Sequence, residues 1–197
     1  MGLFFQRGGR VSYGPKGGVS CYRLRYVIKG KRPALSESMV IDVSLKGHPL
    51  AAIQELSHEA GHAAFPFQFN LSSLEAFHEG LRSSEKLEEP KAAYFKNRRK
   101  DEGAAIASNV EIRREFLAHG WEIGLAGNPS NHRFYNRVYD IWGNTPAAWE
   151  RMGGRAAGRE FSNRVGGVGK KGWGPQSYYE IWDKEFEKLT QLLLRLP

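Results

Sequence analysis

The pattern of apolar and polar positions divides the chain into a short N-terminal part typical of strands and a longer part typical of helices. Apolar and polar residues alternate over residues 20–29 and 38–45, which are also rich in β-branched and aromatic side chains. This alternation predicts two half-buried strands, joined by a turn in GKRPALSE. From His48 to the end of the chain, apolar residues recur at helical spacing instead.

Prolines and glycines mark the ends of the expected helices. Pro49 suits the first turn of a helix that Pro66 ends, and a weaker amphipathic helix follows over residues 72–86. Pro90 opens a longer helix that ends at Gly120. Further helices are expected over residues 128–142, 145–161 and 177–194.

Glycine gathers in two segments outside these helices. Residues 1–19 are expected to form a flexible start, and residues 165–175 a loop. The elements together predict a single α+β domain over residues 1–197, with a small N-terminal sheet followed by a mainly helical remainder. With eleven Phe, eight Tyr and five Trp, the chain can bury a core of normal size.

Composition removes several kinds of site and segment. Cys21 is the only cysteine, which excludes an internal disulfide and a cysteine-based zinc or redox site, so a metal site must use His, Asp or Glu. No apolar run approaches the roughly 18 residues of a membrane span. The first twenty residues lack the apolar core of a signal peptide, so export is expected to use another route.

Charge is a weak guide to partners. The chain has 29 Lys and Arg against 21 Asp and Glu, a net charge of +8, which suits an acidic partner such as nucleic acid, an anionic membrane or a cell-wall polymer. Acidic residues nevertheless alternate with most of the basic ones, and the densest basic run, at residues 96–100, is followed at once by Asp101 and Glu102. We therefore expect a surface of mixed charge and no specific nucleic-acid partner.

The segment LSHEAGHAAF contains an HExxH motif inside the helix that ends before Pro66. His58 and His62 are four residues apart, so on a helix both imidazoles project from one face and can bind one Zn²⁺. Glu59 projects in a different direction and can take a proton from a water on the metal. Small residues in and after the motif leave room for a neighbouring helix. The alternative is that both histidines are ordinary side chains of an amphipathic helix.

A catalytic zinc usually has three protein ligands, so the motif needs a third. The extended motif HExxHxxGxxH is excluded because Phe65 and Gln68 occupy its Gly and His positions. Glu102 is the best carboxylate candidate, since it lies in DEGAA on the long helix, among small residues that permit close packing. Alternatively, Glu102 pairs with Arg98 or Arg99. The rival ligands, in order, are Glu111, Glu79 and His78.

HEAGH and DEGAA together resemble the glutamate zincins (gluzincins). In these the third zinc ligand is the Glu of an NEGxA-like segment on a later helix, and here Asp101 replaces the Asn. The resemblance covers residues 40–120 and implies a zincin-like fold with His58, His62 and Glu102 as zinc ligands. The GxMEN motif of the aminopeptidases is absent. The 39 residues between His62 and Glu102 and the pattern HExGHA look more like bacterial toxin-type metallopeptidases, including anthrax lethal factor-like domains and effector domains fused to type VI secretion spike proteins.

Further residues of such a site are expected on two helices. Asn109 lies seven residues after Glu102 on the same helix face, where its side chain can orient a ligand. Zincins place a Tyr, His or Arg opposite the catalytic Glu to stabilise the oxyanion. His132, Tyr135 and Tyr139 in NHRFYNRVY are the candidates for this catalytic role, with His132 slightly favoured. The alternative place for both tyrosines is the hydrophobic core.

These features favour a zinc-dependent endopeptidase, a hydrolase that cleaves a protein or peptide substrate with a water activated by Glu59. The strand at residues 38–45 is expected to bind substrate at a sheet edge. The toxin resemblance implies an effector that is cytoplasmic before export, is secreted without a signal peptide and acts in a target cell, for example in its periplasm. It also implies an immunity protein as a partner.

Two alternatives keep other functions open. A basic module for nucleic acid or cell-wall polymer would use Lys170, Lys171, Trp173 and Tyr178 or Tyr179. A zinc amidase would keep the same metal site but cleave peptidoglycan crosslinks, because the same water and the same Lewis acid cleave other amides.

Overall fold

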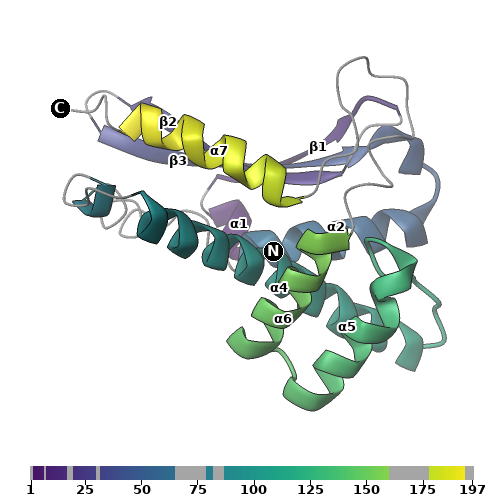
Figure 1. The fold of residues 1–197 in the computed structure, drawn as a ribbon. Helices are drawn as coiled ribbons and strands as arrows, with labels where there is room; N and C mark the ends of the chain where they lie inside the picture. The colour runs from purple at the N-terminus through teal and green to yellow at the C-terminus, as the bar shows by residue number, and fades with distance from the viewer. Residues whose placement is uncertain are drawn as a thin grey trace.

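A three-stranded sheet and a larger set of helices form the described part of the protein (Figure 1). The computed structural model describes residues 2–6, 8–16, 20–29, 32–64, 79–81, 87–159 and 178–193. The predicted α+β class, with a small N-terminal sheet and a mainly helical remainder, is confirmed. Among the helices described, none has the length and apolar character that a membrane span requires.

The sheet has the order β1-β3-β2. Its strands are β1 (Arg10–Gly14), β2 (Cys21–Lys29) and β3 (Arg32–Asp42). β2 and β3 are antiparallel and pair in register from Cys21 opposite Val40 to Lys29 opposite Arg32. The prediction of a turn over residues 30–37 is therefore wrong from Arg32 onward. Residues 32–37 belong to β3, because they pair with β2.

The N-terminal residues are more ordered than expected. Residues 2–6 form helix α1 (Gly2–Gln6), and β1 follows it and pairs in parallel with β3. Phe4 is buried against Met39 and Ala63. The prediction of a flexible start is thus wrong for these residues, because burial of Phe4 and pairing of β1 fix them to the sheet. Residues 17–19 lie outside the described part.

β3 is the central strand, and this overturns the expected substrate-binding edge. Residues 38–42 pair with β1 on one side, and the same strand pairs with β2 on the other. Residues 43–45 form the 3₁₀ helix η1 (Val43–Leu45), which Asp42 caps by accepting a hydrogen bond from the backbone N–H of Ser44 at 2.8 Å. The strand expected over residues 38–45 is therefore central at residues 38–40, where it pairs on both sides, and β1 and β2 are the outer strands of the described sheet.

The expected helices are largely confirmed, with small differences at their ends. They are α2 (Pro49–Ala64), α4 (Glu88–Ala118), α5 (Pro129–Trp142), α6 (Pro146–Arg159) and α7 (Tyr178–Leu193). Asn128 caps α5 by accepting a hydrogen bond from the backbone N–H of Ser130. The weak helix expected over residues 72–86 is described only at residues 79–81, where the chain is helical, and the loop expected over residues 165–175 lies outside the described residues.

α2 and α4 lie between the sheet and the pair α5 and α6 (Figure 1). The largest core cluster joins α4, α5 and α6, and a second one joins α4 to α6 and α7. A smaller cluster lies between α2 and the sheet. α4 thus contributes to two of the three clusters, and it packs directly on α2 as well.

Glycines allow α4 to lie very close to its neighbours. A Cβ atom added to Gly103 would lie 1.7 Å from the carbonyl oxygen of Trp149 in α6, and one added to Gly61 of α2 would lie 2.5 Å from the Cα of Ala105. Such contacts are impossible for a real side chain, so both positions require glycine. The close approach predicted from the small residues in HEAGH and DEGAA is therefore present, and it brings α2 and α4 together at the motif.

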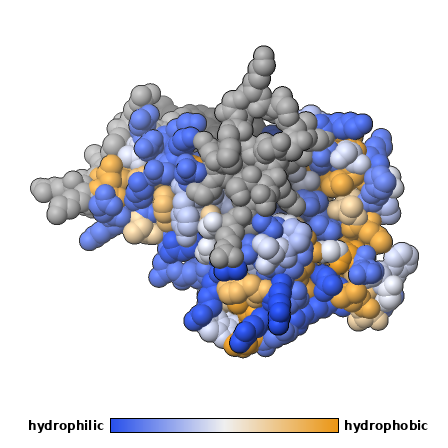
Figure 2. All heavy atoms as spheres, turned by 45° about the vertical axis from the view of Figure 1, so that its right-hand side comes forward, coloured by the Kyte–Doolittle hydropathy of each residue, from blue (hydrophilic) through white to orange (hydrophobic). Residues whose placement is uncertain are grey.

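The surface carries mixed charge, as the sequence predicted. Hydrophilic side chains cover much of the face drawn in Figure 2, with smaller apolar patches among them. Basic residues pair with acidic ones between helices, as in Arg114 with Asp140 at 2.6 Å and Lys91 with Asp183 at 2.5 Å. These exposed pairs contribute little to stability, and they reduce the field that the net charge would otherwise create.

Candidate metal centre

The HExxH residues lie in the middle of α2, where helical geometry places the two histidines one turn apart. The imidazole rings of His58 and His62 have centroids 4.9 Å apart and planes at 88° to each other. His62 and Glu59 are buried, and His58 is partly buried. The arrangement expected from the i, i+4 spacing is therefore present.

Glu102 of α4 approaches both imidazoles. Its Oε1 lies 3.5 Å from Nε2 of His58, and its Oε2 lies 3.6 Å from Nε2 of His62. One donor atom from each of the three residues lies within 4.8 Å of the others, so the cluster could hold a metal ion. A tetrahedral ion with ligands at about 2.1 Å would hold its donor atoms roughly 3.4 Å apart, so the observed spacing fits such an ion.

The two arginines considered as partners of Glu102 form ion pairs with residues of α7 and α6. Arg98 lies 3.3 Å from Glu185 of α7, and Arg99 lies 3.4 Å from Glu150 of α6. Arg98 and Arg99 thus each have an acidic partner on another helix, and Arg98 also interacts electrostatically with Glu102. Because both guanidinium groups are held by other helices, the Glu102 carboxylate faces the two histidines.

The rival ligands that the structure describes, Glu111 and Glu79, are not part of this cluster. Glu111 is exposed and accepts a hydrogen bond from the side-chain amide of Asn144 at 3.1 Å. Glu79 is exposed, and His78 lies outside the described residues. Of the described candidates, Glu102 alone meets His58 and His62.

Asp101 is a site residue that the sequence reasoning missed. Its Oδ2 lies 3.1 Å from Nδ1 of His62, the ring nitrogen opposite the one that faces Glu102, and its side chain is almost fully buried. A carboxylate at the second nitrogen of a metal-binding histidine fixes the tautomer and the ring orientation. The signal was present in DEGAA, where an acidic residue precedes the candidate ligand.

The surrounding carboxylates determine the protonation of His62. Burial alone lowers the pKa of this imidazole, but Asp101, Glu102 and Glu59 together raise it, and the net effect is a pKa of about 9. Without a metal ion, His62 therefore carries a proton at neutral pH. A metal ion would have to displace that proton, and it would replace the positive charge that the carboxylates otherwise stabilise.

Glu59 and His62 share a neighbour in β2. The backbone N–H of Tyr22 donates a hydrogen bond to Oε2 of Glu59 at 2.5 Å. The ring of Tyr22 stacks on the imidazole of His62, with centroids 6.1 Å apart and an interplanar angle of 11°. No sequence motif marked Tyr22, because both contacts depend on how the sheet packs on α2.

Asn109 has a different role from the one expected. Its side-chain amide donates to Oγ of Ser57 at 2.6 Å and to the carbonyl of Gln54 at 3.2 Å, and its oxygen accepts from the backbone N–H of Ala126 at 2.7 Å. The prediction that Asn109 orients a metal ligand is therefore wrong. Asn109 instead connects α2, α4 and the segment before α5. Its contact in the motif region is with Ser57, the residue before His58, and not with His58 itself.

The expected oxyanion donors lie on α5. Tyr135 is completely buried in the largest core cluster, which is the alternative place considered for it. Tyr139 packs against the same cluster and lies beneath the guanidinium of Arg114. His132 is partly buried on the same helix, and its carbonyl accepts a hydrogen bond from Asn136 at 2.8 Å. A catalytic role for His132 or Tyr135 stays a prediction.

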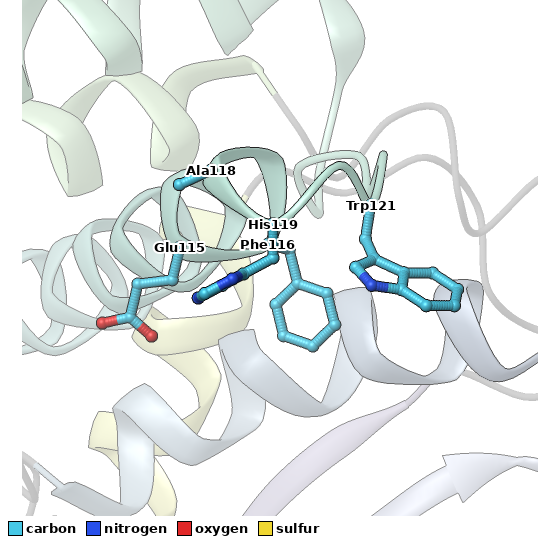
Figure 3. A pocket seen from close by; sticks show the side chains of 5 residues that line it. All are labelled: Glu115, Phe116, Ala118, His119 and Trp121. Carbon is cyan, nitrogen blue, oxygen red and sulfur yellow. The ribbon is translucent and has the colours of Figure 1, made fainter.

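A separate pocket lies at the far end of α4 (Figure 3). It has a volume of about 610 Å³ and is lined by Glu115, Phe116, Ala118, His119 and Trp121. Glu115 follows Glu102 by 13 residues, which is about 20 Å along a helix. This pocket therefore belongs to another part of the surface, and its lining offers only Glu115 and His119 as metal donors.

The surface expected for a basic binding module is only partly described. Tyr178 stacks on Trp182 with ring centroids 5.6 Å apart, and Tyr179 packs against Phe95 and Trp182. Both rings are partly buried and pack against the core cluster that joins α4, α6 and α7. Lys170, Lys171 and Trp173 lie outside the described residues.

Comparison with known proteins leaves this site as the main evidence for function. No family model matches the chain, and no curated protein or solved structure is significantly similar to it. Functional inference therefore depends on the chemistry of the cluster formed by His58, His62 and Glu102, with Asp101 and Glu59 next to it.

Proposed function

We propose that the protein is a zinc-dependent metallopeptidase that cleaves internal peptide bonds. The observation that carries the proposal is the convergence of His58, His62 and Glu102 from two helices, with the buried Glu59 close enough to raise the pKa of His62. Two imidazole nitrogens and one carboxylate form a donor set that suits zinc, and three protein ligands leave a fourth position open for chemistry.

The proposed chemistry divides the work among these residues. His58, His62 and Glu102 would hold a zinc ion, which would supply Lewis acidity toward the scissile carbonyl and toward water. Glu59 accepts a proton from the attacking water and delivers it to the nitrogen of the leaving amine. Asp101 keeps the Nδ1 proton on His62, so that Nε2 is the nitrogen available for coordination.

A peptide substrate is supported by the position of the sheet. β2 is an edge strand, and its residue Tyr22 contacts Glu59 directly, so a free strand edge begins next to the candidate base. An extended peptide can pair with such an edge through main-chain hydrogen bonds. This edge replaces the one wrongly expected at residues 38–45. The toxin or effector role, secretion into a target cell and an immunity partner stay proposals that rest on the resemblance of HEAGH and DEGAA.

Zinc binding is the first test of the proposal. Wild-type protein should bind one zinc ion per chain in elemental analysis, while His62→Ala and Glu102→Ala should lose it or bind it much more weakly. Glu111→Ala is the matched control, because Glu111 is an exposed carboxylate on the same helix and should retain zinc. Failure of the wild type to take up zinc at neutral pH would overturn the proposal.

Hydrolysis is the second test. Zinc-loaded protein incubated with a library of unstructured peptides should produce internal cleavages that mass spectrometry detects. Glu59→Gln should keep both fold and zinc while its turnover falls by about 10² to 10⁴. Normal turnover in Glu59→Gln would contradict the assignment of the base. Cleavage of peptidoglycan fragments in place of linear peptides would identify the amidase alternative.

A further inference from the structure

Tyr22 lies where the sheet meets the motif helix. It is the second residue of β2, directly opposite Met39 of the central strand. Its ring packs against the small core cluster formed by Phe4, Met39 and Ala63, between the sheet and α2. The side chain of Tyr22 therefore stands on the face of the sheet that covers the motif.

The main chain of Tyr22 makes a contact that every substitution except proline leaves in place. Backbone N–H groups of a strand lie close to the plane of the sheet, so an N–H that reaches Glu59 of α2 points away from β3 and out of the free edge. The acceptor is a carboxylate on a side chain that is 5% exposed. A hydrogen bond from a fixed backbone donor to a buried carboxylate restricts the rotation of that carboxylate strongly.

The ring of Tyr22 restricts the second residue of the site. It is nearly parallel to the His62 imidazole, at an interplanar angle of 11°. Asp101 already holds one edge of this imidazole through Nδ1. The Tyr22 ring lies against one face of the His62 imidazole, and Asp101 contacts its Nδ1 edge. Together they define the orientation in which Nε2 of His62 meets Glu102.

We propose that Tyr22 is a positioning residue of the metal centre, holding the Glu59 carboxylate through its main-chain N–H and the His62 imidazole through its ring. This inference rests on the proposed function. It assigns two separable effects to one residue, because the N–H acts on the base and the ring acts on a zinc ligand. The ring should therefore affect zinc affinity, and the N–H should affect turnover.

Three substitutions separate these effects. Tyr22→Leu keeps the N–H and removes the ring, Tyr22→Pro removes both, and Tyr22→Phe keeps both. Proline is tolerated here because this N–H is not part of the ladder with β3. The control is Tyr13→Leu, which removes an exposed tyrosine ring from β1. Each protein is titrated with Zn²⁺ against a chromophoric chelator, and kcat and KM are measured at saturating zinc.

The ring is tested without any turnover. Tyr22→Leu should bind Zn²⁺ about tenfold more weakly than wild type, as expected when a group that orients a ligand is lost. Tyr22→Phe should bind zinc several-fold more tightly than Tyr22→Leu, and Tyr13→Leu should match wild type. Equal zinc affinity for Tyr22→Leu and wild type would overturn the proposal.

The N–H is tested by comparing proline with leucine. Tyr22→Pro should bind zinc as Tyr22→Leu does, because both variants lack the ring. Its kcat should be about 10² lower than that of Tyr22→Leu at a similar KM, because it also lacks the N–H that holds Glu59. Equal kcat values for the two variants would overturn this part. If Tyr22→Pro does not fold, the α-hydroxy acid analogue of tyrosine at position 22 replaces the N–H by oxygen and keeps the ring. It should then lower kcat at wild-type zinc affinity.

The outcomes also distinguish this inference from the proposed function. Wild-type protein that binds no zinc would remove the metallopeptidase and the role of Tyr22 together. Wild-type protein that binds zinc and cleaves peptides, with Tyr22 variants that behave like wild type, would remove only the role of Tyr22. If wild-type protein binds zinc but does not cleave peptides, the zinc affinities of Tyr22→Leu and Tyr22→Phe still decide the role of the ring.

Discussion

At the scale of single residues, the candidate site depends on acidic side chains buried beside imidazoles. Asp101 and Glu102 are adjacent in sequence, yet they face different atoms of the site, because Asp101 meets Nδ1 of His62 while Glu102 meets Nε2 of both histidines. Buried carboxylates are costly unless they are paired. Two carboxylates beside imidazoles make an acidic environment that favours a cation. Two neighbouring positions on one helix could thus supply a ligand, Glu102, and its support, Asp101.

Asp101 should determine how tightly the metal is held. Asp101→Asn removes the negative charge but keeps an oxygen that can accept a hydrogen bond from Nδ1 of His62. We expect zinc affinity to fall about tenfold, which is the lower end of the range for residues that support a ligand. Competition with a chelator measures this change.

The matched control for Asp101 is Asp140→Asn, which removes an exposed carboxylate paired with Arg114. It should leave zinc affinity as it is. An Asp101→Asn protein that binds zinc as tightly as wild type would show that the carboxylate does not support the ligand, and the proximity of the two groups would then have only a structural meaning.

At the scale of elements, α4 is the helix on which the site is built. Its Gly103 lies against α6, and its Ala105 lies against Gly61 of α2. Glu102 and Asp101 sit between these two contacts, so the separation of three helices determines where the carboxylates lie. A small increase in any of these separations would move the ligands apart. Packing and metal geometry are therefore coupled through glycine.

Gly103→Ala should destabilise the protein strongly. The added methyl group would lie 1.7 Å from the carbonyl oxygen of Trp149, which is backbone and cannot rotate away. We expect a loss of about 3 kcal/mol in the free energy of unfolding, at the upper end of the usual cost of overpacking. Chemical denaturation measures this loss.

Gly158→Ala in α6 provides the comparison for Gly103. Among the described residues, no atom lies within 4 Å of a Cβ added there, so alanine should be neutral or should raise stability by up to about 1 kcal/mol. If Gly103→Ala were as stable as Gly158→Ala, the close contact between α4 and α6 described above would be wrong.

At the scale of the whole molecule, the candidate site joins parts of the fold that have separate cores. α2 packs on the sheet, whereas α4 belongs to the cores shared with α5, α6 and α7. A metal ion held by both helices would tie these parts together. Binding to the folded state alone would raise stability by about 2.7 kcal/mol at a free zinc concentration a hundred times the Kd. The melting temperature should then report the occupancy of the site.

This stabilisation by zinc should increase with pH. The pKa of His62 is about 9 without metal, above its usual 6.5, so its protonated form stabilises the metal-free protein fully below 6.5, and this contribution disappears as the pH rises through 9. The affinity for zinc should rise with pH instead, because zinc must displace the proton from His62 and fewer molecules carry that proton at higher pH. We expect the zinc-induced rise in melting temperature to grow between pH 6.5 and 9, and thermal denaturation with and without zinc measures it.

The variant Glu102→Ala is the control for this pH dependence. It should show little or no zinc-induced change at either pH, since a ligand from α4 is missing. A zinc effect in wild type that is larger at pH 6.5 than at pH 9 would contradict the assigned protonation of His62, or would place the zinc elsewhere.

Local sequence patterns determined most of the helices and the HExxH motif of this protein. The strand alternation, the prolines at helix starts and the i, i+4 spacing of His58 and His62 depend on residues close in sequence. The sequence alone therefore predicted the long helices, the presence of β2 and β3, and the motif. Glu102 was also identified, because small residues around it indicated close helix packing. The order at the N-terminus was missed, because Phe4 and β1 gain stability only from partners far along the chain.

Only the tertiary structure decided the rest. The packing of distant elements decides which strand lies in the centre of the sheet and places Tyr22 against Glu59 and His62. It also places Arg98 beside Glu185 of α7. Such contacts have no period in the sequence, because they depend on the position of whole strands and helices rather than on neighbours along the chain. The sequence by itself therefore identified the candidate ligands, and packing determined what surrounds them.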